Sequence, residues 1–123
     1  MIDVQGTLAR LGDDRALLRE TAQFVVEDVP RLLDDVERQL QEGNIEATAR
    51  AVHSLKGLAL NFGAVEAVEA AEAVESAVRE ADVSAAGMSL VNLRSRFDQL
   101  TSAVKREVLG EVDPGQPAFH RWQ

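Results

Sequence analysis

The spacing of apolar residues is the feature that most limits what this chain can fold into. Apolar residues recur at steps of three and four rather than in alternation, and this period places them along one face of a helix. The clearest run lies within residues 14–41, at Leu18, Ala22, Val25, Val29, Leu32, Val36 and Leu40. Valine is plentiful but rarely falls in the alternating runs that are typical of strands. The pattern therefore predicts an all-α protein.

Break signals near the N-terminus separate a short helix from a long one. Residues 2–11 are weakly periodic and predict a short helix or a helical turn. Gly12 and the aspartates that follow it predict a break and an N-cap for the helix at 14–41. Pro30 lies inside that helix, where a missing N–H and ring clashes predict a kink.

Three further helices are predicted, over residues 45–61, 64–80 and 84–108. Asn44 and Ser84 are the expected N-caps of the first and the last of these, and Gly63 is the expected stop after the first. In the last two helices, the expected inward stripes are Val68, Ala71, Val74 and Val78, followed by Leu90, Leu93, Phe97, Leu100 and Val104.

Four amphipathic helices joined by short loops pack most simply as an antiparallel four-helix bundle. With 123 residues, 46% of them hydrophobic, the chain has enough apolar material for one core. The bundle with its short extra N-terminal helix is assigned to residues 1–109. Residues 110–123 contain Pro114, Gly115 and Pro117 and are assigned to a C-terminal tail.

Composition excludes several classes of function. The chain has no cysteine, so disulfides, thiolate metal sites and cysteine nucleophiles are excluded. A net charge of -8 argues against binding to nucleic acid, which requires a basic face. No apolar run approaches the length of about 20 residues that spans a membrane, and residues 1–5 lack the features of a signal peptide. A cytoplasmic protein is expected.

The helix at 45–61 carries the candidate chemistry. On a helical wheel, His53 points away from the apolar face that contains Val52, Leu55 and Phe62. Lys56 and Gly57 lie one turn further on the same side as His53. Ala49 and Leu60 also lie there, and Arg50 borders them. This face combines an exposed imidazole, a cation and a position without a side chain.

Such a face is suited to carrying a phosphoryl group. An exposed imidazole keeps a lone pair on one nitrogen near pH 7 and can attack phosphorus. Lys56 can offset the charge of the attached group. Gly57 costs about 1 kcal/mol relative to alanine within a helix, and on this face its benefit is the close approach of a partner. Ala49, Arg50 and Leu60 are the expected docking surface, and no carboxylate pair or metal cage is evident in the segment.

His53-Ser54-Leu55-Lys56-Gly57, followed by Asn61, Phe62, Gly63 and Ala64, resembles the signature of histidine-containing phosphotransfer (HPt) domains. The resemblance implies that His53 is phosphorylated on the ring nitrogen distal to the backbone. It implies exchange with an aspartate of a response-regulator receiver domain, which also supplies Mg²⁺, so no cofactor is expected on this chain. Lys56 would hold the phosphoryl oxygens and Gly57 would admit the receiver. Asn61 and Gly63 are assigned structural roles at the helix end.

Two alternatives remain open at this point. One is a docking bundle whose binding does not depend on His53. The other is an HPt-like domain of a kinase, phosphorylated by an ATP-binding domain elsewhere in a longer chain, and a sensor histidine kinase is a further possible partner. Family likeness favours a monomer, and Met1 favours a free-standing protein. The sequence does not identify the receiver, the direction of phosphoryl flow or the pathway.

Overall fold

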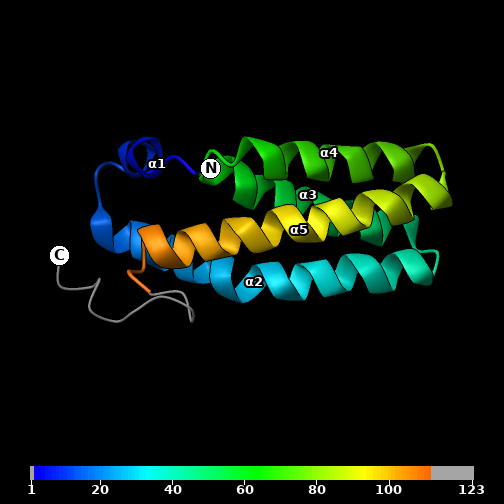
Figure 1. Ribbon diagram of the computed structural model, residues 1–123, viewed down its shortest axis with the longest axis horizontal. Helices are drawn as coiled ribbons and strands as arrows, with labels where there is room; N and C mark the ends of the chain where they lie inside the picture. Colours follow the sequence, from blue (N-terminus) through cyan, green and yellow to red (C-terminus); the bar gives the residue numbers. More distant parts are fainter. Residues whose placement is uncertain (1, 112–123) are drawn as a thin grey trace.

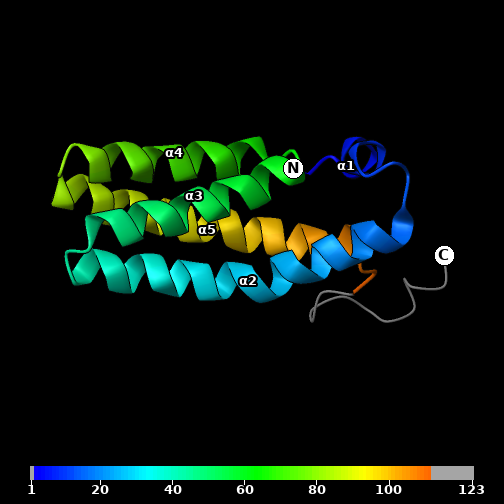
Figure 2. The ribbon, with the colours of Figure 1, turned by 180° about the vertical axis from the view of Figure 1, so that it is seen from behind.

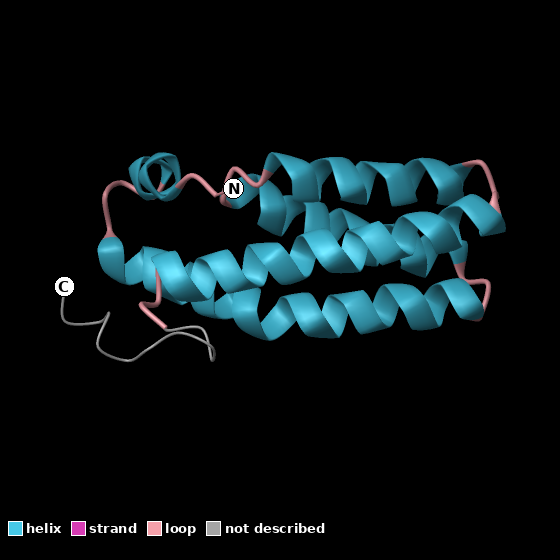
Figure 3. Ribbon diagram, in the orientation of Figure 1, coloured by secondary structure: helices cyan, strands magenta, loops and turns pink. Residues whose placement is uncertain are grey.

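The computed structural model describes residues 2–111, and all the regular secondary structure in this range is helical (Figure 3). The helices are α1 Val4–Arg10, α2 Arg15–Gln41, α3 Ile45–Asn61, α4 Val65–Arg79 and α5 Val83–Glu107. The prediction of an all-α protein with one short and four long helices is therefore confirmed, and helix ends differ from the predicted ones by one residue or so.

Helices α2–α5 form an antiparallel four-helix bundle, as predicted (Figure 1). Each of these helices packs on its neighbour in the chain, and α2 also packs on α5, which closes the bundle. Helix α1 lies at the end where α3 stops and α4 begins. There the Asp3 amide donates to the Phe62 carbonyl at 2.8 Å, and Thr7 Oγ1 donates to the Asn61 carbonyl at 2.7 Å. These bonds join α1 to the C-terminal end of α3.

Helix α2 is continuous through Pro30, as predicted. Figure 2 shows one unbroken ribbon whose axis changes direction partway along, as expected for a helix with an internal proline. At its start, the carboxylate of Asp14 accepts a hydrogen bond of 3.0 Å from the Leu17 amide. This bond confirms the predicted N-cap, because it satisfies one of the amides that a helix leaves unpaired in its first turn.

Of the two other predicted caps, Ser84 was wrong, whereas Asn44 occupies its predicted position but does not bond to the helix through its side chain. Helix α5 begins at Val83, and Asp82 is its N-cap because its carboxylate accepts from the Ala85 amide at 3.0 Å. Ser84 therefore lies within the first turn and does not cap it. Asn44 is at the N-cap position of α3 but makes no side-chain cap bond. Its amide group instead donates to Oε1 of Gln39, in the last turn of α2, at 2.8 Å.

The hydrophobic core runs along the centre of the bundle and includes most of the predicted stripes. The residues with almost no exposed surface are Phe62, Phe97, Leu33, Leu55, Leu93, Leu100, Val25, Val29, Val36, Val52, Val74 and Val104. On α2, Leu33 is fully buried, whereas the predicted Leu32 and Leu40 are only partly buried. The reason is that α2 packs on both α3 and α5, so its buried face is wider than a single stripe. Val68 and Leu90 are likewise partly buried, at the core's edge.

The division between residues 1–109 and residues 110–123 stays a prediction, because residues 112–123 lie outside the described part of the chain. Helix α5 ends at Glu107, close to the predicted end at residue 108. Among the described residues, none of the helices combines the length and the apolar character needed to cross a lipid bilayer.

Candidate functional site

His53 projects from the middle of α3 into solvent, and 81% of its side chain is exposed. The opposite face of α3 packs into the core through Ala51, Val52, Leu55, Ala59 and Phe62, all of them buried. Leu58, on the same side, is partly buried. The predicted orientation of α3 is therefore confirmed. Packing holds the helix in place, and the imidazole is left accessible to a partner.

Glu75 of α4 is the acidic neighbour of His53. The distance from its Oε2 to His53 Nδ1 is 4.0 Å, which is within ion-pair range but longer than a hydrogen bond. Since Nδ1 faces α4, the other ring nitrogen, Nε2, lies on the side of the ring away from Glu75. Only 23% of the Glu75 side chain is exposed. The carboxylate is thus placed to favour a proton on Nδ1, leaving the lone pair on Nε2.

Lys56 lies one turn after His53 and is paired with two carboxylates of α4. Its Nζ is 3.3 Å from Glu72 Oε2 and 3.4 Å from Glu75 Oε1. Hydrogen bonds that its ammonium donates to Glu72 and Glu75 raise the pKa of Lys56 above its ordinary value. Lys56 is therefore charged at neutral pH, and Glu75 is shared between it and the imidazole.

Gly57 is exposed on α3 next to His53, and a Cβ built at this position would meet nothing within 4 Å. Its backbone is helical, so neither close packing nor an unusual backbone conformation requires glycine here. A helix gives up about 1 kcal/mol by carrying glycine rather than alanine. This observation supports the expectation that Gly57 keeps the surface beside His53 clear.

The other predicted site residues occupy the places expected for them on α3. Leu60 and Arg50 are exposed, and Ala49 is half-buried. Asn61 ends the helix, and its backbone carbonyl accepts from Thr7 and from Arg10 Nη2, the latter at 2.8 Å. Gly63 follows with a φ of 62°, a left-handed conformation that suits glycine, and Asp3 packs against it.

The sequence did not lead to Glu72 or Glu75 as residues of this site. A signal for both residues was available once a helical hairpin had been predicted. His53 and Glu75 lie equally far before and after Ala64, and so do Lys56 and Glu72. In an antiparallel pair of helices joined at that point, residues at equal distances from the turn lie at the same level. What the sequence lacked was the rotation of α4 about its axis.

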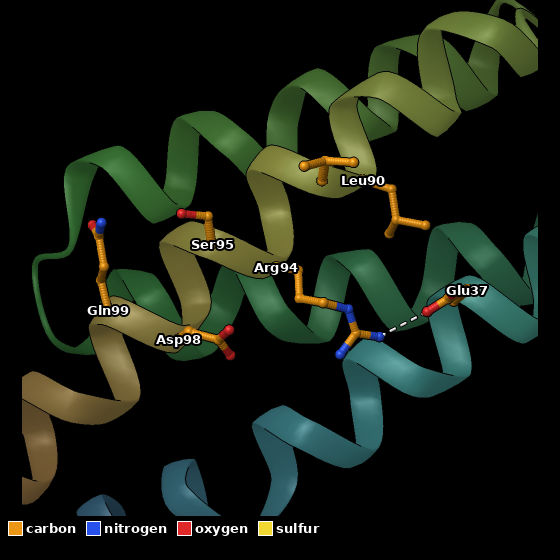
Figure 4. Close-up of a pocket in the computed structure, with 7 residues that line it drawn as sticks. Glu37, Leu90, Arg94, Ser95, Asp98 and Gln99 are labelled. Carbon is orange, nitrogen blue, oxygen red and sulfur yellow. Dashed lines mark hydrogen bonds and ion pairs between the residues drawn. The ribbon is translucent and has the colours of Figure 1, made fainter. Parts of the chain in front are cut away.

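An open groove lies on a different side of the bundle, between α2 and α5 (Figure 4). It is lined by Glu37, Leu90, Val91, Arg94, Ser95, Asp98 and Gln99. Arg94 bridges the two helices, with Nη2 2.8 Å from Glu37 Oε2 and 3.1 Å from Asp34 Oδ1. These contacts join α5 to α2, whereas the His53 site is built by α3 and α4.

Among residues 2–111, no group of three or more histidine, aspartate or glutamate side chains is arranged to hold a metal ion.

Comparison with known proteins gives one match. A family model described as Hpt domain matches residues 20–107, which begin in the second turn of α2 and run to the end of α5. The matched region contains α2 from its second turn, the whole of α3, α4 and α5, and every residue of the site at His53. No curated protein and no solved structure matched the chain.

Proposed function

Because the chain belongs to the Hpt domain family, whose members carry phosphoryl groups in two-component signalling, we propose that His53 is the residue that carries it here. The donor and acceptor are aspartates of receiver domains. The single observation that supports this most is the exposed imidazole beside the open position at Gly57. A carrier must present its nucleophile to another protein's active site, and this face of α3 does so.

The transfer requires little from this chain beyond a positioned nucleophile. The lone pair of His53 Nε2 attacks the phosphorus of an aspartyl phosphate. The bond between phosphorus and the aspartate oxygen breaks, and the carboxylate leaves with its electron pair. The ring keeps its proton on Nδ1 and becomes a phosphorylated imidazolium, whose positive charge faces Glu75 Oε2 at 4.0 Å. Return of the group to an aspartate is the reverse of this step.

Lys56 and the receiver supply the charge that balances the phosphoryl group. A phosphoryl group adds about -1.5 to -2 charge near pH 7, and Lys56 is the cation one turn from His53. The receiver's Mg²⁺ would neutralise further charge at the donor aspartate. Since this chain contributes the carrier and the partner contributes the metal, we propose a receiver domain as the partner and a kinase as the original source of the phosphoryl group.

The test is transfer from a panel of phosphorylated receiver domains, each with Mg²⁺, to the wild-type chain and to His53→Gln. We expect acid-labile, alkali-stable label on the wild type and none on His53→Gln, with equal helical content by circular dichroism. Label that persists in His53→Gln would overturn the assignment. Absence of label from every receiver, together with tight receiver binding that His53→Gln leaves unchanged, would favour a docking bundle instead.

A further inference from the structure

The ammonium of Lys56 is paired with two carboxylates, whereas a single ion pair requires only one. Glu72 Oε2 is 3.3 Å and Glu75 Oε1 is 3.4 Å from Nζ, and both carboxylates come from α4. We propose that Glu72 and Glu75 form an acidic clamp that competes with phosphorylated His53 for Lys56. By this competition the clamp sets how readily His53 gives up its phosphoryl group. The inference rests on the proposed function and adds a regulating element to the same site.

The contacts of Lys56 fit a competition rather than a fixed structural bond. Only 25% of the Lys56 side chain is exposed, because it lies across the surface between α3 and α4. Glu72 remains 54% exposed, so its pair with Lys56 is solvated and worth little to the fold. The raised pKa of Lys56 agrees with a cation that the carboxylates already hold before phosphorylation. The clamp therefore holds the Lys56 ammonium before phosphorylation, and breaking its pair with Glu72 costs little free energy.

The charges on the two sides of the competition are similar. Glu72 and Glu75 offer two negative charges to Lys56, and a phosphoryl group on His53 offers about -1.5 to -2. When the charges are this closely matched, removing one carboxylate is enough to shift Lys56 toward the phosphoryl group. A carrier with the full clamp binds its phosphoryl group less tightly and donates it more easily. A carrier without Glu72 retains the group longer.

Glu72 is a cleaner probe of the clamp than Glu75. Glu75 also faces His53 Nδ1 at 4.0 Å, so its replacement changes the imidazole and the lysine at once. The contact of Glu72 that defines the clamp is with Lys56. Glu69 provides the matched control, because it is an exposed glutamate of the same helix, nearly one turn before Glu72 in α4. Glu69→Gln changes the net charge as Glu72→Gln does, without removing a clamp residue.

The experiment measures the equilibrium constant for phosphoryl exchange between this chain and one receiver that labels the wild type. We expect Glu72→Gln to shift the constant about three- to tenfold toward phosphorylated His53, as one charge at this range does near a protein surface. Glu69→Gln should stay within about twofold of the wild type, since its charge is more distant and more screened. The same comparison is repeated in a Lys56→Gln background, where the effect of Glu72→Gln should disappear.

The outcomes separate the clamp from the proposed function. If no receiver labels the wild type, the proposed function fails and the clamp fails with it, because no phosphoryl group is present to compete for Lys56. If the wild type is labelled but Glu72→Gln behaves as Glu69→Gln does, the clamp is wrong and the carrier function stands. If the shift persists in the Lys56→Gln background, Glu72 acts by direct repulsion on the phosphoryl group, which overturns competition for Lys56. Circular dichroism of each variant verifies that the bundle is intact.

Discussion

The residue that carries the proposed chemistry differs from an ordinary surface histidine in its surroundings. His53 has Lys56 and Gly57 one turn away on its own helix and Glu75 facing it from α4. A solvated imidazole alone would be an undirected nucleophile. Here one ring nitrogen faces a carboxylate, and the side chain of the neighbouring position is absent. The assignment of function depends on this group of residues rather than on the histidine by itself.

Replacement of Lys56 tests the role of charge beside His53. We expect Lys56→Gln to accelerate loss of the phosphoryl group about tenfold, because it removes the charge-assisted hydrogen bond that Lys56 would donate to the phosphoryl oxygens. Lys56→Arg keeps the charge, so it should accelerate loss of the phosphoryl group less than Lys56→Gln does. The raised pKa of Lys56 means that its charge persists below about pH 10, so the difference should not depend on pH near neutrality. The decay of labelled protein measures it, and equal decay in all three proteins would contradict a role for Lys56.

At the level of the single helix, α3 has two roles: one face packs into the core and the other is presented to a partner. Its buried face, with Leu55 and Phe62 at its centre, fixes the helix in the bundle, and the opposite face is free to serve a partner. Both faces could be predicted from the sequence because the apolar period of a helix specifies which side is buried. On the partner-facing side, Gly57 is the residue with the lowest helix propensity, and its place in the helix is not required by packing.

Substitution of Gly57 should separate stability from function. Gly57→Ala should raise the free energy of unfolding by about 0.5–1 kcal/mol, because alanine is the better helix former and its Cβ meets open space. Gly57→Gln should also stabilise the helix, and its long side chain should reduce transfer from a receiver by tenfold or so. Urea unfolding and the transfer assay measure the two effects. A Gly57→Gln protein that transfers at the wild-type rate would refute the close approach of a partner at this position.

The helix starts were predicted less well than the helix faces. Asp82 and Ser84 are both residue types that cap helices, and they lie two positions apart at the start of α5, so residue type alone does not decide between them. The choice depends on which residue the helix starts after, and that depends on how α5 packs on α4. Asn44 was placed correctly, but its side chain bonds to Gln39 in the last turn of α2, a local competition that a cap preference does not describe.

The cap of α5 can be tested with a matched pair of substitutions. Asp82→Ala should lower the free energy of unfolding by about 1 kcal/mol, because it removes the bond of 3.0 Å to the Ala85 amide. Ser84→Ala should change it by less than about 0.5 kcal/mol, since Ser84 lies inside the first turn. Thermal or urea unfolding of both variants measures the difference. A larger loss for Ser84→Ala than for Asp82→Ala would show that the helix starts elsewhere.

At the scale of the whole molecule, the site exists only because two helices meet. His53 and Lys56 come from α3, and the carboxylates around them come from α4. The residues on α3 could be predicted from spacing within one helix. Glu72 and Glu75 could not be assigned in the same way, because their part in the site depends on the rotation of α4 in the bundle. The bundle itself was predictable, since four amphipathic helices with short loops have few other ways to bury their faces.

The core that holds this arrangement can be tested with two phenylalanines. Phe97 of α5 is fully buried, and Phe97→Ala should lower the free energy of unfolding by about 3–5 kcal/mol through lost burial and the cavity left behind. Phe24 of α2 is exposed, so Phe24→Ala should stay within about 0.5 kcal/mol of the wild type. Urea unfolding gives both values. Similar losses for the two variants would mean that the bundle is packed differently.

The most direct test of the central claim is to locate the phosphoryl group in the labelled wild-type chain by mass spectrometry under alkaline conditions. Trypsin cleaves after Arg50 and Lys56, so one short peptide, Ala51–Lys56, contains both His53 and Ser54. We expect a receiver and Mg²⁺ to place the group on this peptide, and we expect fragmentation to assign it to His53. A group assigned to Ser54, or to any other peptide of the chain, would contradict the account.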